Sequence, residues 1–327
     1  MSEITARCTI QKRQTTAHLW RTWSVTVTAI IVTNCTQRKS HRPETDLVQL
    51  RRLQDLGRLA AAWHRCVSRA PLSGPAGSLY QGRSITDTTA AAAHLGTSWY
   101  VVSAGLGLVC SDQPVPTYEC TVAPGTELGR RLELSGATAA DWWYALNAAQ
   151  PHPLSRLIAR SPTLLALPGT YLRMVQEDLA KVSSTKAKQL RIFTSASGAQ
   201  IVPSHLVKCV MPYDDRLESV QNYAGTQSDF AQRALRHFVE SLGATMLPLD
   251  EARAIVSASL DHQPRRTRST GTRTSDEEIR RLVAAQWARH AGRSTRLLRY
   301  LRDEAGISCE QKRFSRLWQV LAAEMRT

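Results

Sequence analysis

Short runs of apolar residues alternate with helical patterns along most of the chain. The runs predict buried strands at residues 25–33, 99–103, 163–167 and 190–195, and the second continues to residue 109 through a bend marked by glycines. Apolar residues at helical spacing predict helices at residues 47–70, 86–95, 139–149, 171–182 and 230–242, and another that starts at residue 154. This alternation predicts an α/β fold with a mainly parallel sheet flanked by helices.

The last part of the chain has a different pattern. Residues 262–275 are a polar linker rich in Arg and Thr, and helical stretches follow at residues 276–290, 294–304 and about 308–325. Ser275 and Ser308 are suited to cap the first and third stretches, and Gly306 marks a turn that makes the last two resemble a helix-turn-helix. We therefore divide the chain into a basic N-terminal arm (1–24), an α/β catalytic body (25–261), the linker (262–275) and a helical nucleic-acid-binding segment (276–327).

The distribution of charge supports this division. The 327 residues carry a net charge of +15, and the isoelectric point is near 10.0. Residues 1–52 have a net charge of +6 and residues 264–327 a net charge of +8, whereas residues 53–263 come to only +1. Basic flanks around a near-neutral body are typical of nucleic-acid-binding proteins, and we expect DNA as the partner. A charge excess that only aids solubility is the alternative.

Several protein classes are disfavoured by what the sequence lacks. The longest apolar run covers residues 25–32, far short of the roughly 20 residues that span a bilayer, so we expect no membrane partner. A GxxxxGK[ST] motif is absent, which excludes a P-loop NTPase. The seven cysteines are scattered and form no CxxC motif, which predicts reduced thiols, a cytoplasmic location and no structural zinc. We expect no metal and no other cofactor.

The first candidate site follows the first predicted strand. Asn34 offers an amide, Thr36 a hydroxyl, and Arg38 and Lys39 positive charge. Ligands of open α/β sheets bind at the carboxyl ends of strands, and these groups suit a phosphate, a base edge or a sugar. A polar connection that binds no ligand is the alternative.

The second candidate site lies at the end of the second strand. Ser103 and Gly105 come first, and a loop stiffened by prolines then presents Asp112, Tyr118 and Glu119. Carboxylates held by a stiff loop suit N-glycosidic chemistry, because one group can orient water and its charge stabilises an oxocarbenium-like sugar. An ordinary proline-rich connection is the alternative.

Two further groups complete the candidates. Asp214 and Asp215, next to Arg216, could form an acid–base pair in the substrate pocket, a metal site, or a helix cap with a surface ion pair. The C-terminal helices have a basic side that suits phosphate contacts or is simply solvated, formed by Arg299, Arg302, Lys312, Arg313 and Arg316.

Four short segments, in order, carry a resemblance to a known family. They are TNCTQRK (33–39), LYQGR (79–83), WYVVSAGLGLV (99–109) and PTY (116–118). They resemble an uncharacterised bacterial and phage α/β family with an (S/N)CT-x-(R/K)K loop, an LY-x-G-R segment and a W-x-(I/V)-SA-x-(Y/L)GL strand followed by P-x-Y. The resemblance covers roughly residues 25–125 and implies kinship with enzymes of nucleobases and glycosidic bonds, including the tRNA-guanine transglycosylase neighbourhood. The layout is also similar to anti-phage DNA glycosylases that excise glucosylated hydroxymethylcytosine.

The residues and the resemblance together favour a DNA glycosylase that flips a modified base out of the duplex. Asp112 or Glu119 would orient water, Asn34 and Tyr118 would read the base or sugar, and Thr36, Ser103, Gly105, Asp214 and Asp215 would line the pocket. Arg38, Lys39 and Arg83 would contact DNA beside the pocket. The body has few lysines that could form a Schiff base, so we expect a monofunctional enzyme.

The chain lacks the GQDPYH-like motif of uracil glycosylases, so no water-activating aspartate is carried over from that motif.

Two functions other than a glycosylase stay open. A non-catalytic DNA-binding regulator, whose α/β body senses a nucleotide-like ligand, would have the same charge distribution. A deoxyribosyltransferase-like hydrolase is the third interpretation, and it would not need basic ends.

Overall fold

A computed structural model describes residues 28–50, 55–265 and 271–325. The chain divides into two compact units: one runs up to Tyr213 and includes Gly225–Ala258, and the other holds Asp214–Ala224 and the residues from Ser259 onward. The end predicted for the body, residue 261, is close to this boundary, but Asp214–Ala224 belongs to the second unit. The predicted N-terminal arm lies outside the described residues. Across the described ranges, no helix is long and apolar enough to cross a membrane.

The first unit is built on a five-stranded sheet with the order β5-β4-β1-β8-β9. Its strands are β1 (Ile30–Asn34), β4 (Trp99–Ser103), β5 (Gly107–Cys110), β8 (Thr163–Ala166) and β9 (Leu190–Phe193). β4, β1, β8 and β9 run parallel, and β5 is an antiparallel edge strand. β1 takes the centre because Ile31 and Val32 are β-branched and fully buried, which suits a strand covered on both faces. The predicted α/β fold with a mostly parallel sheet is confirmed.

One predicted strand is wrong in its second half. β4 ends at Ser103, and the chain then reverses into β5, so that Gly107 pairs with Ser103 and Cys110 pairs with Tyr100. Gly107 has a φ of 76°, a left-handed conformation that glycine adopts without steric cost and that the tight reversal requires. Because of this hairpin, the chain after Cys110 emerges at the amino end of β4.

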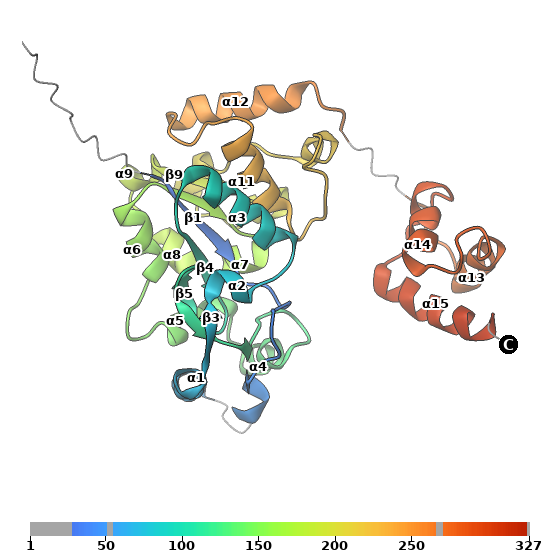
Figure 1. Cartoon of the computed structure of the whole chain (residues 1–327), viewed down its shortest axis with the longest axis horizontal. Coiled ribbons are helices and arrows are strands. Elements are labelled where there is room, and N and C mark those ends of the chain that lie inside the picture. The colour runs from blue at the N-terminus through green and yellow to red at the C-terminus, as the bar shows by residue number, and fades with distance from the viewer. Residues whose placement is uncertain (1–27, 51–54, 266–270, 326–327) are drawn as a thin grey trace, which may run out of the picture. The chain divides into compact units, whose positions relative to one another are not determined.

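Helices cover both faces of the sheet. α3 (Arg83–Leu95) and α11 (Phe230–Glu240) lie side by side over one face (Figure 1). The crossover from β8 to β9 contains α7 (Gly169–Met174), α8 (Gln176–Ala180) and α9 (Ser184–Ala187), so the single helix predicted at residues 171–182 is broken. Right-handed crossovers place these helices on the face opposite α3.

α1 (Leu56–Arg69) and α5 (Ala139–Leu146) pack together beside the β4–β5 turn. The indole N–H of Trp63 donates to the carbonyl of Gly105, and that of Trp142 donates to the carbonyl of Ala104, both at 2.7 Å. These two buried hydrogen bonds fix the turn that follows β4.

The remaining elements of this unit surround the sheet. Two small ribbons pair β2 (Thr45–Asp46) with β7 (Tyr118–Glu119), and β3 (Leu72–Pro75) with β6 (Pro114–Pro116). The other helices are α2 (Ala76–Leu79), α4 (Glu127–Ser135), α6 (Pro153–Arg160), α10 (Ala196–Ala199) and α12 (Leu249–Asp261), the last of which crosses into the second unit. The sequence patterns did not predict α4 or α12.

The strand order identifies where a ligand would bind. From β1 the chain moves to β4 on one side, and later to β8 and β9 on the other side. The order therefore reverses between β1 and β8. In open α/β sheets, the crevice outside the carboxyl ends of the strands at such a reversal is the usual binding site.

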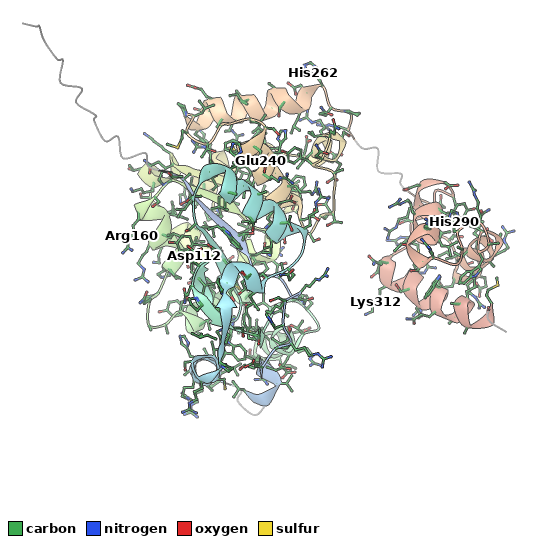
Figure 2. The ribbon with its side chains drawn as sticks, in the orientation of Figure 1. Asp112, Arg160, Glu240, His262, His290 and Lys312 are labelled. Atoms are coloured by element: carbon green, nitrogen blue, oxygen red, sulfur yellow. The ribbon has the colours of Figure 1, made fainter. Side chains whose placement is uncertain are left out.

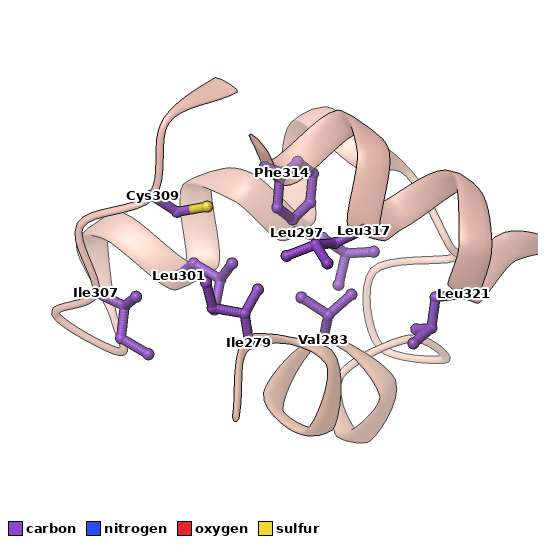
Figure 3. Packing of buried hydrophobic residues seen from close by; sticks show 9 residues of the cluster. All are labelled: Ile279, Val283, Leu297, Leu301, Ile307, Cys309, Phe314, Leu317 and Leu321. Carbon is purple, nitrogen blue, oxygen red and sulfur yellow. The ribbon is translucent and has the colours of Figure 1, made fainter. Parts of the chain in front are cut away.

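The C-terminal helical segment (residues 271–325) contains α13 (Asp276–Ala285), α14 (Ser294–Asp303) and α15 (Gln311–Glu324). Ser275 caps α13 as predicted, because its hydroxyl accepts the amide of Glu278 at 3.2 Å. Ser308 does not cap α15, which begins after Glu310. Figure 3 shows the apolar core of the segment, to which all three helices contribute: Ile279, Val283, Leu297, Leu301, Ile307, Cys309, Phe314, Leu317 and Leu321.

Candidate functional site

Two interlocked amides occupy the carboxyl ends of β1 and β8. The Nε2 of Gln232, in α11, donates to Asn34 Oδ1 at 2.9 Å, and to Thr33 Oγ1 and the Ala166 carbonyl at 3.0 Å. The Nδ2 of Asn34 in turn donates to the Cys35 carbonyl at 2.9 Å. Neither amide can be turned over without placing N–H against N–H or oxygen against oxygen.

This arrangement leaves one polar atom over. Gln232 has no exposed surface, and its Oε1 has no hydrogen-bond partner among the described residues. A buried amide oxygen without a partner is costly, on the order of 1–3 kcal/mol, so such atoms are few in folded proteins. Gln232 therefore holds a buried acceptor in a fixed position at the strand reversal between β1 and β8.

A chain of buried hydroxyls lies at the carboxyl end of β4. Ser103 Oγ is 2.6 Å from the hydroxyl of Tyr118, which is 2.8 Å from the hydroxyl of Tyr80. Ser103 Oγ also accepts the backbone amides of Gly105 and Leu106, at 3.2 and 3.0 Å. Both of its lone pairs are used, so Ser103 donates its proton to Tyr118, and Tyr118 donates to Tyr80. The proton of Tyr80 is left to donate to another group.

The tyrosines of this region stay uncharged at neutral pH. Burial, and then the neighbouring Cys35 thiol, raise the pKa of Tyr80 and Tyr118 above the ordinary value for tyrosine. The same two causes raise the pKa of Tyr171, whose hydroxyl lies 3.0 Å from Cys35 Sγ and donates to the Cys35 carbonyl at 3.1 Å. These hydroxyls can therefore donate or accept hydrogen bonds but cannot serve as bases near pH 7.

Two sequence motifs meet at this edge of the sheet. Residues 38–40 run beside residues 79–81, with hydrogen bonds from the amide of Ser40 to Leu79 and from the amide of Gln81 to Arg38, both at 2.9 Å. The ammonium of Lys39 lies 4.5 Å from the centre of the Tyr118 ring, a cation–π distance. The loop after β1 and the LYQGR segment thus form one structure around the hydroxyl chain.

Gly105 is required by the approach of Tyr118. A Cβ at position 105 would lie 2.6 Å from Cδ2 of the Tyr118 ring and 3.1 Å from Cβ of Cys120. Only glycine leaves room for the ring that carries the central hydroxyl of the chain. Gly105 thus lies beside Ser103 and Tyr118.

The other predicted residues near β1 have separate tasks. The hydroxyl of Thr36 donates to the Arg38 carbonyl at 2.8 Å and accepts the amide of Gln81 at 3.3 Å, so it shapes its own loop. Arg38 is exposed, and Arg83 at the start of α3 lies 3.4 Å from the Asp87 carboxylate.

The placement expected for Asp112 is wrong. Its carboxylate accepts the hydroxyls of Ser98 and Ser111, both at 2.9 Å, at the amino end of β4 (Asp112 is labelled in Figure 2). Asn34 lies at the opposite, carboxyl edge, so the two residues do not share a pocket. The reason is the β4–β5 hairpin, which carries the chain back across the sheet before Asp112.

Glu119 is close in sequence to the site but faces another pocket. It follows Tyr118 in β7, where successive side chains point to opposite sides. Glu119 lines a pocket of about 250 Å³ together with Asp46, Leu47 and Arg130. The Glu119 carboxylate therefore does not lie beside the hydroxyl chain formed by Ser103, Tyr118 and Tyr80.

Asp214 and Asp215 belong to the second unit, so the structure does not join them to Asn34 or Ser103. Asp214 accepts the Nε of Arg216 at 3.0 Å and lies 3.9 Å from Arg265. Partial burial acts to raise the pKa of Asp214, but the hydrogen bonds from Arg216 outweigh it and hold the pKa below the usual range. Of the three sequence-based interpretations, the helix cap with an ion pair fits, because the Asp214 carboxylate also caps the turn that starts at Asp215.

Sequence reasoning missed a buried ion pair beside Gln232. Asp229 Oδ1 accepts the Nε of Arg233 at 2.6 Å, and the Arg233 side chain has no exposed surface. The amide and hydroxyl of Thr226 also donate to Asp229, at 2.9 and 2.8 Å. This carboxylate is fully engaged, so it anchors the start of α11 and thereby positions Gln232.

A pocket of about 440 Å³ borders the hydroxyl chain. Its walls are Gly77, Tyr80, Gln81, Gly82 and the outer side of α3, and its volume is in the range of small-molecule sites. Tyr80 belongs to both the pocket and the chain. Among the described residues, no three His, Cys, Asp or Glu side chains gather in a way that could hold a metal ion.

The predicted DNA-binding residues of the C-terminal helical segment differ in availability. Arg299 on α14 and Lys312 on α15 are exposed, and Lys312 extends away from the helix (Figure 2). Arg313 is instead structural, because it donates to Asp276 at 2.7 Å and to the Thr274 carbonyl at 2.8 Å. Arg302 donates to the Cys309 carbonyl at 2.9 Å, and Arg316 lies 3.5 Å from Asp276 but stays 71% exposed.

Comparison of the chain with protein-family models, with curated proteins and with solved structures finds no match.

Proposed function

We propose that this protein is a DNA glycosylase that takes a modified base into the site at the carboxyl ends of β1, β4 and β8 and hydrolyses its N-glycosidic bond. One observation carries the proposal: the neutral side chains at the carboxyl ends of β1, β4 and β8 leave over one acceptor, Gln232 Oε1, and one donor, the Tyr80 hydroxyl. A base edge offers the complementary donors and acceptors. The buried hydrogen-bonding groups of the site are neutral, which suits a neutral base, while the Lys39 ammonium over the Tyr118 ring can face the DNA backbone.

The chemistry would act on the leaving base. Hydrolysis breaks the bond from C1′ to the base nitrogen, the electron pair stays on the base, and water adds to C1′ and releases a proton. A hydrogen bond from Tyr80 to the base would stabilise the charge that develops on it as this bond breaks. The raised pKa of Tyr80 keeps its proton in place for that role.

The charged parts of the protein would supply affinity for DNA. Lys39 and Arg38 lie beside the site, and the C-terminal helical segment carries exposed cations. Flipping a base out of a duplex costs a few kcal/mol, which phosphate contacts of this kind can offset. We propose a cytoplasmic protein acting on double-stranded DNA, with anti-phage defence as its purpose if the base is a phage-type modification.

The experiment is a base-release assay. Purified protein is incubated with unmodified DNA and with phage DNA that carries hypermodified bases, released base is identified by mass spectrometry, and abasic sites are detected by alkaline cleavage. The proposal expects free base and alkali-labile strands from one modified DNA. It expects Tyr80→Phe to slow release by roughly 100-fold, the usual contribution of a positioned proton donor. Tyr144→Phe, at an exposed tyrosine, is the control.

A second function is favoured by one specific observation. The carboxylate of Asp229, three residues before Gln232, is already paired with Arg233. A DNA-binding regulator that senses a nucleotide-like ligand needs no free carboxylate. Ligand-dependent DNA binding without any released base would favour that regulator and overturn the glycosylase.

A further inference from the structure

We propose that α15 reads the sequence of double-stranded DNA from the major groove, while exposed arginines of α14 hold the phosphate backbone. This inference does not depend on base removal, because it concerns the C-terminal helical segment alone. It assigns different tasks to the two helices, which the charge pattern of the sequence does not distinguish.

The packing of α15 decides which side chains are available. Phe314, Leu317 and Leu321 face the core of the segment and are buried (Figure 3). The opposite face is therefore exposed along the helix. Its residues are Gln311, Lys312, Ser315, Arg316, Gln319, Val320 and Ala323. The fourteen residues of α15 span about 21 Å, and an α-helix fits the width of the major groove.

The chemistry of this face is that of base recognition. Lys and Arg hydrogen-bond to guanine, Gln hydrogen-bonds to adenine, and Ser can contact several bases. Gln311 and Gln319 are both exposed here, and each amide offers the paired donor and acceptor that match the major-groove edge of adenine. The helix has no Asp or Glu from Gln311 to Ala323, and Arg316, which lies 3.5 Å from Asp276, keeps 71% of its side chain exposed.

The outward face of α14 is different because its charges are arginines. Leu297 and Leu301 are buried, which leaves Arg296 and Arg299 on the exposed side. Neither has an ion pair within the described part of the chain. By contrast, Arg280, Arg281 and Arg289 are paired with Glu324, Glu278 and Glu304. Guanidinium groups without a carboxylate partner suit phosphate contacts.

The connection between the two helices is braced from outside. Residues 304–310 join α14 to α15, a longer link than the three or four residues of an ordinary helix-turn-helix. The amide of Thr272 donates to Gly306 at 2.8 Å, and the amide of Ser308 donates to Thr272 at 3.1 Å. Gly271 fits beside this bridge, because a Cβ there would lie 2.6 Å from the Ile307 carbonyl carbon. This bridge ties the segment that precedes α13 to the link, so α14 and α15 are held in one orientation.

The first test uses the full chain and unmodified duplex DNA, so base removal cannot affect the result. Selection from a random duplex pool should enrich one short sequence. Fluorescence anisotropy should then show binding to that sequence weakened about 5- to 100-fold by Arg316→Ala or Gln319→Ala, with relaxed preference at single positions. Both residues are exposed, and circular dichroism melts check that the variants remain folded.

The second test distinguishes base recognition by α15 from phosphate binding by α14. Each lost phosphate contact lowers the slope of log affinity against log salt by about 0.9, so the double variant Arg296→Ala/Arg299→Ala should lower it by roughly 2. Gln319→Ala should leave the slope unchanged. Arg281→Ala removes one charge from the same segment, but from an ion pair, and serves as the matched control.

Three outcomes would overturn the inference. Salt-dependent binding without any enriched sequence would mean that the segment only clamps phosphates. An enriched sequence that Arg316→Ala and Gln319→Ala leave unchanged would mean that another element reads it. Tighter binding to single-stranded RNA of the same sequences would mean that the partner is not duplex DNA.

Discussion

Removal of a single oxygen from the centre of the site tests the hydroxyl chain. Tyr118→Phe deletes the hydroxyl that lies 2.6 Å from Ser103 Oγ and 2.8 Å from Tyr80. The ring itself would stay, because it contacts Trp63 edge-on and lies against Gly105. The substitution therefore changes hydrogen bonding and little else.

The structure sets the expected size of the effect. Two hydrogen bonds are lost, each with a net value of about 1 kcal/mol, and the Ser103 proton and the Tyr80 oxygen are left without their partner in a region closed to water. We expect Tyr118→Phe to lower the free energy of unfolding by about 2–4 kcal/mol. Tyr144→Phe, at a residue that is 53% exposed, should change it by less than about 0.5 kcal/mol.

Urea unfolding followed by tryptophan fluorescence measures this difference. A second measurement is alkaline titration of tyrosine absorbance. Burial raises the pKa of Tyr80 and Tyr118, so both should ionise only when the protein unfolds, well above pH 10. If Tyr118→Phe costs no more than Tyr144→Phe, or if all tyrosines titrate near pH 10 in the folded protein, the hydroxyl chain described here is incorrect.

Three further predictions concern other parts of the first unit. Gly105→Ala should destabilise by about 1–3 kcal/mol through overpacking against Tyr118, whereas Gly57→Ala, in an open helical position, should stabilise by about 0.5–1 kcal/mol in the same urea assay; equal effects would contradict the close approach. Burial lowers the pKa of His237 below 6.5, so the unfolded state binds its proton first. Above pH 6.5, His237 should therefore not change the free energy of unfolding. As the pH drops below 6.5, this free energy should decrease by up to about 1.4 kcal/mol per pH unit, and His237→Gln should reduce that loss. Gln232→Glu puts a carboxylate oxygen where three acceptors now receive N–H bonds, and it should cost about 3 kcal/mol or more by urea unfolding; a neutral effect would mean that the amide is not locked.

The parallel sheet could be predicted because its strands are nearly continuous apolar runs. β8 and β9 begin at the residues that those runs predicted and end one or two residues earlier. β1 begins at Ile30, and residues 25–27 of its predicted range lie outside the described residues. Asn34 and Ser103 follow directly from this pattern, since the carboxyl ends of parallel strands meet at one edge of the sheet. The positions of Asn34 and Ser103 can therefore be predicted from the local sequence alone.

The direction of the chain after β4 could not be predicted in the same way. The glycines at 105 and 107 mark a bend, but apolar residues on both sides are equally compatible with one long strand and with a hairpin. The hairpin was the correct choice, and it moves Asp112 to the other edge of the sheet. The direction of this one turn therefore determines that Asp112 does not lie at the site where the sequence predicted it.

The contacts of α11 with the strand ends could not be predicted from any local sequence pattern. Gln232 bonds Asn34 across 198 positions of the chain, and helical periodicity indicates only that position 232 lies near an inward face. A polar residue at such a position interrupts the apolar periodicity of the helix, and the sequence gives no sign that it makes a specific contact. Tyr80 had a signal, the LYQGR segment, but its hydroxyl partner could be identified only once β7 was placed.

The most direct test of the account is the release of a free base from modified duplex DNA, measured by mass spectrometry with wild-type protein and Tyr80→Phe side by side. The account predicts one released base, matching alkali-labile sites, and a release rate about 100-fold lower in the variant. No released base from any modified DNA, or equal rates in the two proteins, would contradict the assignment of the site at the carboxyl ends of β1, β4 and β8.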